Sequence, residues 1–310
     1  MKKDLLSLAD FSEKEILSFV KLGQIVKKNP LKFKTAFKNE TLLMIFEKPS
    51  LRTRVSFEVG MTQMGGHAIY YDVATSPLGK KETIEDTARA ASRYVDIIMA
   101  RLNHFEDTLA LSKNSSVPVI DALSDMNHPC QILGDLLTIL EHKKKLKGLT
   151  LAYFGDAENN VTYSLLHGCA QTGINMNIAC PKDKEFLPNQ SVLDEANKIA
   201  KKTGSKINIY HDAKSAAKDV DVIYTDSWMS YHIDKNKEKE RVEKLMPFQV
   251  NEKVLGYAKK DVIFMNCLPA KRGYEQTAEV IDGKHSIVFD QAENRLHIQK
   301  ATMLILLGKR

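Results

Sequence analysis

Two hydroxyl groups and a guanidinium group occur close together at Ser50, Arg52 and Thr53, and this set of donors suits a phosphate or another anion. The three residues follow an apolar run, 41–46, that is typical of a buried strand, and they open a segment that can be helical. The start of a helix offers free backbone N–H groups and the positive end of its dipole to an anion. Residues 50–54 therefore predict an anion-binding helix start, with an ordinary capped helix and exposed arginines as the alternative.

Two further groups in the first half of the chain could act on a carbonyl or a phosphate. Arg101 directly follows the predicted strand 96–100, and His128 precedes Pro129, Cys130 and Gln131 at a predicted helix start. A helix N-terminus lowers the pKa of a histidine, which favours a neutral imidazole that donates a hydrogen bond to a carbonyl oxygen. Taken singly, a surface arginine and a capping histidine are the commoner interpretations.

The second half of the chain also has polar residues directly after predicted strands. The amides of Asn159 and Asn160 could hold an amino-acid zwitterion, the carboxylate of Asp226 could receive an ammonium group, and Cys267 would bring a thiol to the same edge. Arg295 lies at the start of the last predicted helix. Because ligands of parallel sheets bind at the carboxyl ends of the strands, these residues predict a ligand site.

Short apolar runs alternate with helical patterns along the chain, which predicts an α/β fold. We expect strands at 41–46, 67–73, 96–100, 117–121, 149–154, 175–179, 206–210, 220–225, 262–266 and 286–289. We expect helices at 13–26, 51–60, 83–93, 129–142, 160–172 and 293–307. The predicted architecture is two doubly wound parallel-sheet domains joined by a linking helix, with the C-terminal helix returning to the first domain. A lysine-rich stretch before Gly148 places the boundary, so the first domain is 1–147, with 293–310 packing back on it, and the second is 148–292.

The composition argues against several classes of protein. Of the 310 residues 43% are hydrophobic and 27% charged, as in globular proteins, and no apolar run approaches the roughly 20 residues that cross a bilayer. The first residues lack the features of a secretory signal, so we expect a cytoplasmic protein. The net charge of +6 lies in lysine clusters without interleaved aromatic residues, which argues against nucleic-acid binding. The four cysteines form no C-x-x-C pair, which argues against a zinc site and a disulfide framework.

Four motifs are very specific when taken together: FEKPSLRTRVSFE at 46–58, HPCQ at 128–131, CLP at 267–269 and FDQAENR at 289–295. They resemble the ornithine carbamoyltransferase family, over nearly the whole chain, and HPCQ and CLP resemble its ornithine branch rather than the aspartate branch. The resemblance implies transfer of the carbamoyl group of carbamoyl phosphate to the side-chain amine of L-ornithine, giving L-citrulline and phosphate for arginine biosynthesis. It implies no metal or cofactor, and a homotrimer with shared active sites whose domains close on the second substrate.

The resemblance also assigns roles to individual residues. Carbamoyl phosphate would be bound in the first domain and ornithine in the second. The residues that contact carbamoyl phosphate would be Ser50, Leu51, Arg52, Thr53, Arg101, His128, Pro129, Cys130, Gln131, Cys267, Leu268 and Arg295. The residues that bind ornithine would be Asn160, Asp226, Ser230 and Tyr231, and the catalytic residues would be Arg101, His128 and Cys267.

Two departures from the family pattern affect the expected amine pocket. Asn266 stands where relatives usually carry a histidine before Cys-Leu-Pro, and Tyr231 and His232 replace a methionine and a glycine of the substrate loop. Another amine, such as putrescine or an N-acylornithine, is therefore an alternative acceptor. Because of Asn266, a non-catalytic protein of the same fold that binds carbamoyl phosphate is a second alternative.

A third departure concerns the expected contact between subunits. Pro77 stands where relatives often carry a glutamine that reaches into a neighbouring active site. Lys80 or Lys81 could supply that contact instead.

Overall fold

The computed structural model describes residues 2–76, 81–229 and 233–309. The chain divides into two compact units: unit 1 comprises Met1–Leu137 and Glu293–Arg310, and unit 2 comprises Thr138–Ala292. Both division points fall inside helices, because α5 (Pro129–Lys143) and α12 (Val288–Leu306) each begin in one unit and end in the other. The first division point therefore lies before the lysine-rich stretch that the sequence suggests as the boundary.

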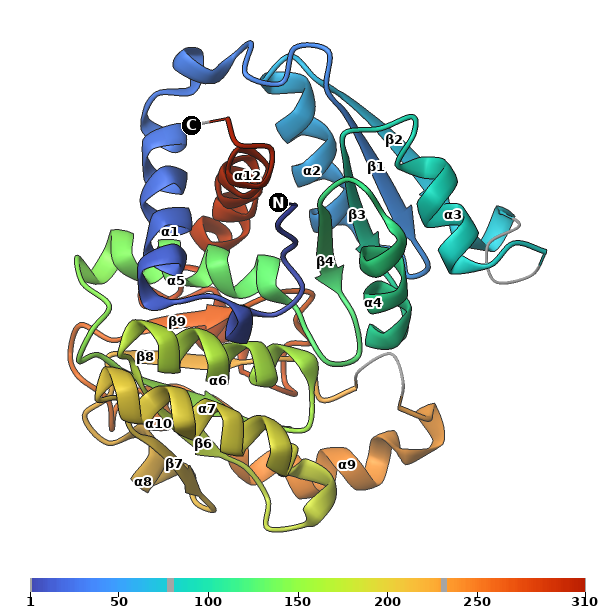
Figure 1. Cartoon of the computed structure of the whole chain (residues 1–310). Coiled ribbons are helices and arrows are strands. Elements are labelled where there is room, and N and C mark those ends of the chain that lie inside the picture. The colour runs from blue at the N-terminus through green and yellow to red at the C-terminus, as the bar shows by residue number, and fades with distance from the viewer. Residues whose placement is uncertain (1, 77–80, 230–232, 310) are drawn as a thin grey trace. The chain divides into compact units, whose positions relative to one another are not determined.

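Unit 1 is built on a four-stranded parallel sheet with the order β2-β1-β3-β4 (Figure 1). In this register Met44 lies opposite Tyr70 on one side and Met99 on the other. The inner strands are continuous apolar runs because helices cover both faces of the sheet. The strands are β1 (Thr41–Phe46), β2 (His67–Asp72), β3 (Ile97–Arg101) and β4 (Val119–Leu123).

Helices α3 (Ile84–Ala91) and α4 (Phe105–Asn114) cover one face of this sheet, where Ala88 and Leu111 pack with Ile45 and Ile98. Helices α1 (Glu13–Lys28), α2 (Leu51–Gln63) and α12 lie on the other face (Figure 1). This wrapping brings the starts of α2 and α5 to the carboxyl ends of the strands that precede them, β1 and β4.

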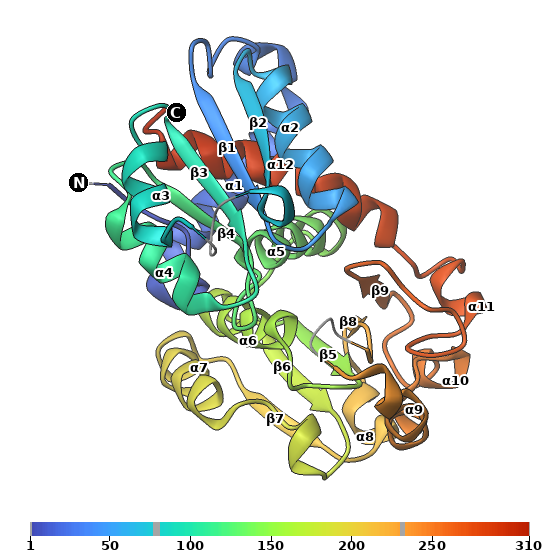
Figure 2. The same ribbon diagram turned by 90° about the vertical axis from the view of Figure 1, so that its right-hand side faces the viewer.

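Unit 2 is built on a five-stranded parallel sheet with the order β7-β6-β5-β8-β9 (Figure 2). Its strands are β5 (Thr150–Phe154), β6 (Asn175–Ala179), β7 (Ile207–Tyr210), β8 (Val222–Thr225) and β9 (Ile263–Asn266). Helices α6 (Asn160–Thr172) and α7 (Gln190–Thr203) pack together over one face (Figure 2). The other face carries a core cluster with residues from α8 (Ala213–Ala217), α10 (Glu252–Leu255) and α11 (Ala278–Ile281), and α9 (Glu238–Leu245) completes the unit.

The predicted α/β class and the two parallel sheets are confirmed, and nine of the predicted strands lie within two residues of their predicted starts and ends. The strand predicted at 286–289 is wrong. Ser286 forms only an isolated bridge to Phe264, and α12 already begins at Val288, which is buried while Phe289 is 70% exposed. A short apolar run at a helix start has no periodicity that separates a strand from a helix.

In the described part of the chain, none of the helices combines the length and the apolar character that a membrane crossing requires.

Candidate active site

The start of α2 has the geometry of a capped helix at the end of a strand. Ser50 is its N-cap, and its hydroxyl accepts a hydrogen bond from the backbone N–H of Thr53 (3.3 Å) and donates to Thr53 Oγ1 (3.1 Å). Arg52 lies half-buried in the first turn, whereas the Leu51 side chain is 75% exposed. The turn thus joins hydroxyl groups, a guanidinium group and the positive end of a helix.

Arg295 joins this helix start to α5. Its Nη1 donates to Gln131 Oε1 at 2.6 Å and its Nη2 to Thr53 Oγ1 at 3.4 Å. Gln131 in turn donates to Asp135 Oδ1 at 2.8 Å, and Arg295 and Gln131 are both 2% exposed. Residues from three distant parts of the sequence are therefore fixed against one another inside unit 1.

His128 lies in the same cluster of positive charge. It is buried directly before α5, and its pKa is well below its ordinary value because burial disfavours the charged form and because Arg295, Arg101 and Arg52 repel a proton. Arg101 ends β3 and is itself only 4% exposed. A neutral imidazole among three guanidinium groups is an arrangement that a multiply charged anion would neutralise.

Lys48 adds a cation that the sequence analysis did not single out. It precedes the Ser50 cap by two residues, and its pKa is lowered by burial and by the nearby charge of Arg101. The run of alternating charges at 47–48 looks like an ordinary polar turn, so only the fold shows that Lys48 faces the same cluster.

The thiol of Cys130 belongs to the core of unit 1. It is fully buried and donates a weak hydrogen bond to the backbone carbonyl of Asp121 (3.6 Å), and burial raises its pKa to about 12. The Cys130 side chain is therefore held in the core, and contact of Pro129 and Cys130 with a ligand stays a prediction.

In unit 2 the carboxyl ends of the neighbouring strands β8 and β9 bring Asp226 and Cys267 together. The Cys267 thiol donates to Asp226 Oδ1 at 3.0 Å, and both residues are half-buried. Leu268 follows in the left-handed backbone region, with φ of 57°. The expectation that a carboxylate and a thiol lie side by side in the second half of the chain thus holds in the geometry.

The two asparagines after β5 have different tasks. Asn159 caps α6, since its Oδ1 accepts from the Thr162 N–H (2.9 Å), while its Nδ2 donates to the Tyr153 hydroxyl (3.0 Å) and to the Asp156 carbonyl (2.6 Å). Asn160 is the first residue of the helix and is half-buried at the same end of the sheet. Asn159 is thus used as the helix cap, and the role of Asn160 in binding a ligand stays a prediction.

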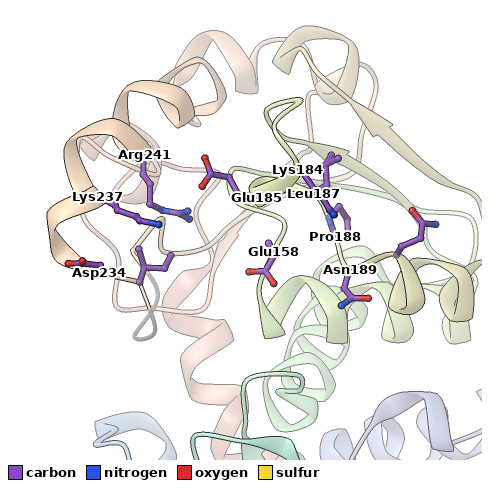
Figure 3. A pocket seen from close by; sticks show the side chains of 11 residues that line it. Glu158, Lys184, Glu185, Leu187, Pro188, Asn189, Asp234, Lys237 and Arg241 are labelled. Atoms are coloured by element: carbon purple, nitrogen blue, oxygen red, sulfur yellow. The ribbon is translucent and has the colours of Figure 1, made fainter.

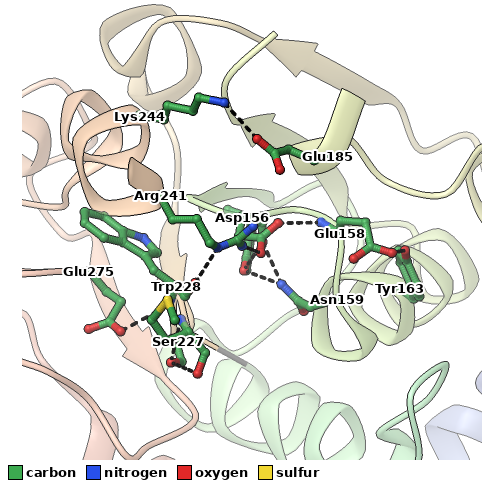
Figure 4. Close-up of polar contacts among 12 residues, drawn as sticks. Asp156, Glu158, Asn159, Tyr163, Glu185, Ser227, Trp228, Arg241, Lys244 and Glu275 are labelled. Carbon is green, nitrogen blue, oxygen red and sulfur yellow. Dashed lines mark hydrogen bonds and ion pairs between the residues drawn. The ribbon is translucent and has the colours of Figure 1, made fainter. Parts of the chain in front are cut away.

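A buried ion pair between Asp156 and Arg241 supports this end of the sheet, and the sequence analysis missed it (Figure 4). Arg241 donates to Asp156 Oδ2 and, through Nε, to the Trp228 carbonyl at 3.3 Å. Burial raises the pKa of Asp156 to about 7, against the opposing effect of Arg241. Arg241 thereby ties the segment after β8 to the turn after β5. Its position in the charged run 235–244 gave no sign of burial.

Gly155 is required where this turn meets Trp228. Its φ of 118° lies in the region that favours glycine, and a Cβ atom there would lie 2.7 Å from Trp228 Nε1. Trp228 is fully buried, and its backbone N–H donates to Glu275 Oε1 at 3.2 Å. The segment after Asp226 is therefore packed directly against the turn that leads to Asn160.

Unit 2 also has an open hollow of about 1100 Å³ beside the ion pair (Figure 3). Acidic and basic side chains line it together: Glu158, Glu185, Asp234, Lys184, Lys237 and Arg241. Of the predicted ornithine-binding residues that the structure describes, none lines this hollow. Its mixed charge and open form do not define a ligand.

Several predicted residues lie outside the described ranges: Ser230, Tyr231 and His232 of the substrate loop, and Pro77 and Lys80. Lys81 is described and is exposed. Asn266 is described and is fully buried at the end of β9.

The chain belongs to the aspartate/ornithine carbamoyltransferase family. The family model described as the aspartate/ornithine carbamoyltransferase carbamoyl-P binding domain matches residues 3–141, and the one described as the Asp/Orn binding domain matches residues 147–306. Several relatives that are similar over the full length carry the name ornithine carbamoyltransferase. The protein from Methanosarcina acetivorans is 49% identical (99% of this chain, 100% of the relative), and that from Methanococcus aeolicus is 48% identical (98% and 99%). The solved structure of ornithine carbamoyltransferase from Pyrococcus furiosus is 44% identical, with a TM-score of 0.95 over 100% of this chain and 98% of that one.

Proposed function

We propose that the chain transfers the carbamoyl group of carbamoyl phosphate to the side-chain amine of L-ornithine, with L-citrulline and phosphate as products. The observation that carries the proposal is the cationic cluster of unit 1, in which the buried Arg101 and Arg295 and the half-buried Arg52 act on a neutral His128. The names of the full-length relatives support ornithine as the acceptor.

In this proposal unit 1 binds carbamoyl phosphate. The hydroxyl groups of Ser50 and Thr53, the first turn of α2 and the guanidinium group of Arg52 hold the phosphate. Arg295, fixed by Gln131 and Thr53, adds positive charge where the phosphate leaves. Catalysis requires charge on the phosphate to be stabilised most strongly when the bond to carbon breaks.

Arg101 and His128 are proposed to donate hydrogen bonds to the carbamoyl oxygen. The low pKa of His128 keeps its imidazole neutral, with one N–H group that can donate. Negative charge grows on the carbamoyl oxygen in the tetrahedral intermediate, and donors fixed in a buried site stabilise it without reorganisation.

Unit 2 is proposed to bind ornithine. Asn160 and Asp226 receive the charged groups of the amino acid, and Cys267, at 3.0 Å from Asp226, lies near the side-chain amine. Ser230 and Tyr231 are proposed to complete this pocket on the basis of the family motif. Leu268 is proposed to offer its backbone carbonyl to the carbamoyl nitrogen.

The reaction needs the neutral amine as its nucleophile. The amine nitrogen attacks the carbamoyl carbon, a C–N bond forms, and the C–O bond to phosphate breaks with the electron pair leaving on the phosphate oxygen. The attacking nitrogen must lose a proton, and the departing phosphate can accept it; the Asp226–Cys267 pair is proposed to orient the amine toward the carbamoyl carbon. Groups held in a fixed orientation supply much of the rate gain.

The test is citrulline formation from carbamoyl phosphate with ornithine, putrescine and N-acetylornithine as acceptors in parallel assays. We expect a strong preference for ornithine in kcat/KM. Preference for one of the other amines would move the proposal to that acceptor, and binding of carbamoyl phosphate without turnover of any amine would contradict an enzymatic function.

We also propose that the protein is a homotrimer in the cytoplasm that serves arginine biosynthesis. Apolar side chains are exposed on α2 and on the edge strand β2, at Leu51, Val55 and Ile69, where burial against another subunit would remove them from water. All four cysteines are free thiols, which suits a reducing compartment. Light scattering should give three times the 35.0 kDa chain mass, and the gene should restore growth without arginine to a bacterial strain that lacks this activity. The mass of a monomer would contradict the proposed trimer, and a failure to restore growth would contradict the proposed role in arginine biosynthesis.

A further inference from the structure

Asn266 occupies the point where β9 ends and the Cys267–Leu268 turn begins. Its side chain is fully buried and makes two hydrogen bonds: Oδ1 accepts from the backbone N–H of Leu268 at 2.7 Å, and Nδ2 donates to Gln276 Oε1 at 2.9 Å. The carboxamide therefore links the backbone of Leu268, just after β9, to the side chain of Gln276, which lies ten residues after Asn266.

The direction of every hydrogen bond in this network is dictated by one backbone group. The N–H of Leu268 can only donate, so the oxygen of the Asn266 amide must face it and the nitrogen must face Gln276. Gln276 is also fully buried, and it must present its oxygen to Asn266 while its nitrogen reaches the Lys271 carbonyl at 3.4 Å. A buried polar network in which the partners agree in this way holds a single geometry.

The backbone of Asn266 is anchored as well. Its N–H donates to Gln291 Oε1 at 3.0 Å, and Gln291 Nε2 donates to the Tyr224 hydroxyl at 3.2 Å. The backbone of Asn266 is thus held by Gln291 near the start of α12, and its side chain is held by Gln276. Asn266 can therefore serve as a rigid support for the residues that follow.

The residues that follow need such a support. Leu268 has a φ of 57°, a conformation that a residue with a Cβ atom adopts only when its surroundings impose it. The hydrogen bond from its N–H to Asn266 lies directly at this strained position. Cys267, between the two, has its sulfur 3.0 Å from Asp226 Oδ1.

We infer that Asn266 is a positioning residue for the transfer reaction: its carboxamide, held by Gln276, fixes the Cys267–Leu268 turn so that the Cys267 thiol and the Leu268 carbonyl are presented in one geometry. This inference rests on the proposed function. It also gives Asn266 a task in an active enzyme, whereas the departure from the family pattern alone left open a protein without activity.

The decisive measurement is the steady-state kinetics of Asn266→Ala, Asn266→His and the wild type at pH 8. Alanine deletes the acceptor of the Leu268 N–H, and we expect kcat to fall about 10- to 100-fold while the KM for carbamoyl phosphate stays within about twofold. A neutral histidine has one ring nitrogen that accepts and one that donates, so it can bond to Leu268 and Gln276 in place of the amide. We expect it to restore kcat to within about threefold of the wild type.

The matched control is Asn177→Ala in β6. Asn177 is a buried carboxamide of the same sheet with two hydrogen bonds, to the Ala216 carbonyl (3.0 Å) and from Asn208 (3.3 Å), but it lies away from the turn. We expect this variant to lose thermal stability with little change in kcat. Equal kcat losses in Asn177→Ala and Asn266→Ala would show that Asn266 acts only through stability and would overturn the inference.

Gln276→Met keeps the test decisive if Asn266→Ala does not fold. Methionine has nearly the same shape but offers no strong acceptor, so the Asn266 amide loses its fixed direction and we expect kcat to fall a few-fold with the KM for carbamoyl phosphate unchanged. An unchanged kcat in this folded variant would overturn the inference. If the wild type itself forms no citrulline, the proposed function fails; if it does and the variants match it, only this inference fails.

Discussion

The two candidate sites are built in opposite ways. In unit 1 positive charge is concentrated: three arginines gather around His128, and its pKa is lowered by their repulsion as well as by burial. In unit 2 the described carboxylates Asp156 and Asp226 each have a hydrogen-bond partner, Arg241 and Cys267. The positive charge of unit 1 therefore favours binding of an anion. In unit 2 the hydrogen-bonded pairs fix the side-chain positions, so we expect a ligand there to be selected mainly by its shape.

The largest effect that this comparison predicts is on the stability of unit 2. Arg241→Met leaves the Asp156 carboxyl group buried opposite an apolar side chain, and we expect the free energy of unfolding to fall by about 3–5 kcal/mol. Urea denaturation measures it. Lys244→Met on the same helix is the control, because it removes exposed ion pairs with Asp183, Glu185 and Glu240 and should change stability little. Equal losses would show that the buried pair has no special weight.

A smaller effect, on rate rather than stability, is expected in unit 1. Arg101→Met removes a donor and a positive charge from the proposed oxyanion site, so we expect kcat to fall about 10²–10³-fold. Citrulline assays measure the change. Arg54→Met is the control, because Arg54 is exposed on α2 and its Nε bonds to Glu58 (3.3 Å). If both variants lose activity equally, net charge and not the buried position of Arg101 controls the rate.

The Cys267 thiol gives a still smaller effect. Cys267→Ala deletes the hydrogen bond to Asp226, and we expect kcat to fall about tenfold and the pH profile to shift. Cys169→Ala, in a buried position of α6, should leave both unchanged. A rate and pH profile for Cys267→Ala that match the wild type would falsify the proposed role of the thiol.

The last effect depends on pH and concerns His128. The pKa of His128 is depressed in the folded protein, so the unfolded chain takes up a proton first as the pH falls. The stability that goes with the neutral ring is fully present above pH 6.5, the ordinary value, and is lost below it by up to about 1.4 kcal/mol per pH unit. Thermal unfolding of the wild type and His128→Gln from pH 7.5 to 5 gives the stability of each protein as a function of pH. The difference in stability between the two proteins should be constant above pH 6.5 and should change only below it. Parallel curves would mean that His128 is not buried in its neutral form.

The same contrast explains what the sequence could predict. The residues of unit 1 lie in short motifs such as 50–54 and 128–131, where strand end, cap and charge are neighbours in the chain, so local reasoning finds them. Asp156 and Arg241 lie 85 positions apart and Arg241 is surrounded by charged residues, so nothing local marks it as buried. Asn266 was noticed only as a departure from a pattern, because its task depends on Gln276 and on the backbone direction of Leu268.

Helix α12 carries Arg295 into unit 1 after the chain has passed through all of unit 2. During synthesis, most of unit 1 is made first, and then the whole of unit 2 follows as one continuous segment. Only afterwards is the last helix of unit 1 made. Domains generally fold as the chain emerges, N-terminal parts first, but here the earlier unit has to wait for the later one. The Arg295 bonds to Gln131 and Thr53 can form only after unit 2 has been made, so a growing chain cannot assemble the complete anion site ahead of the amine site.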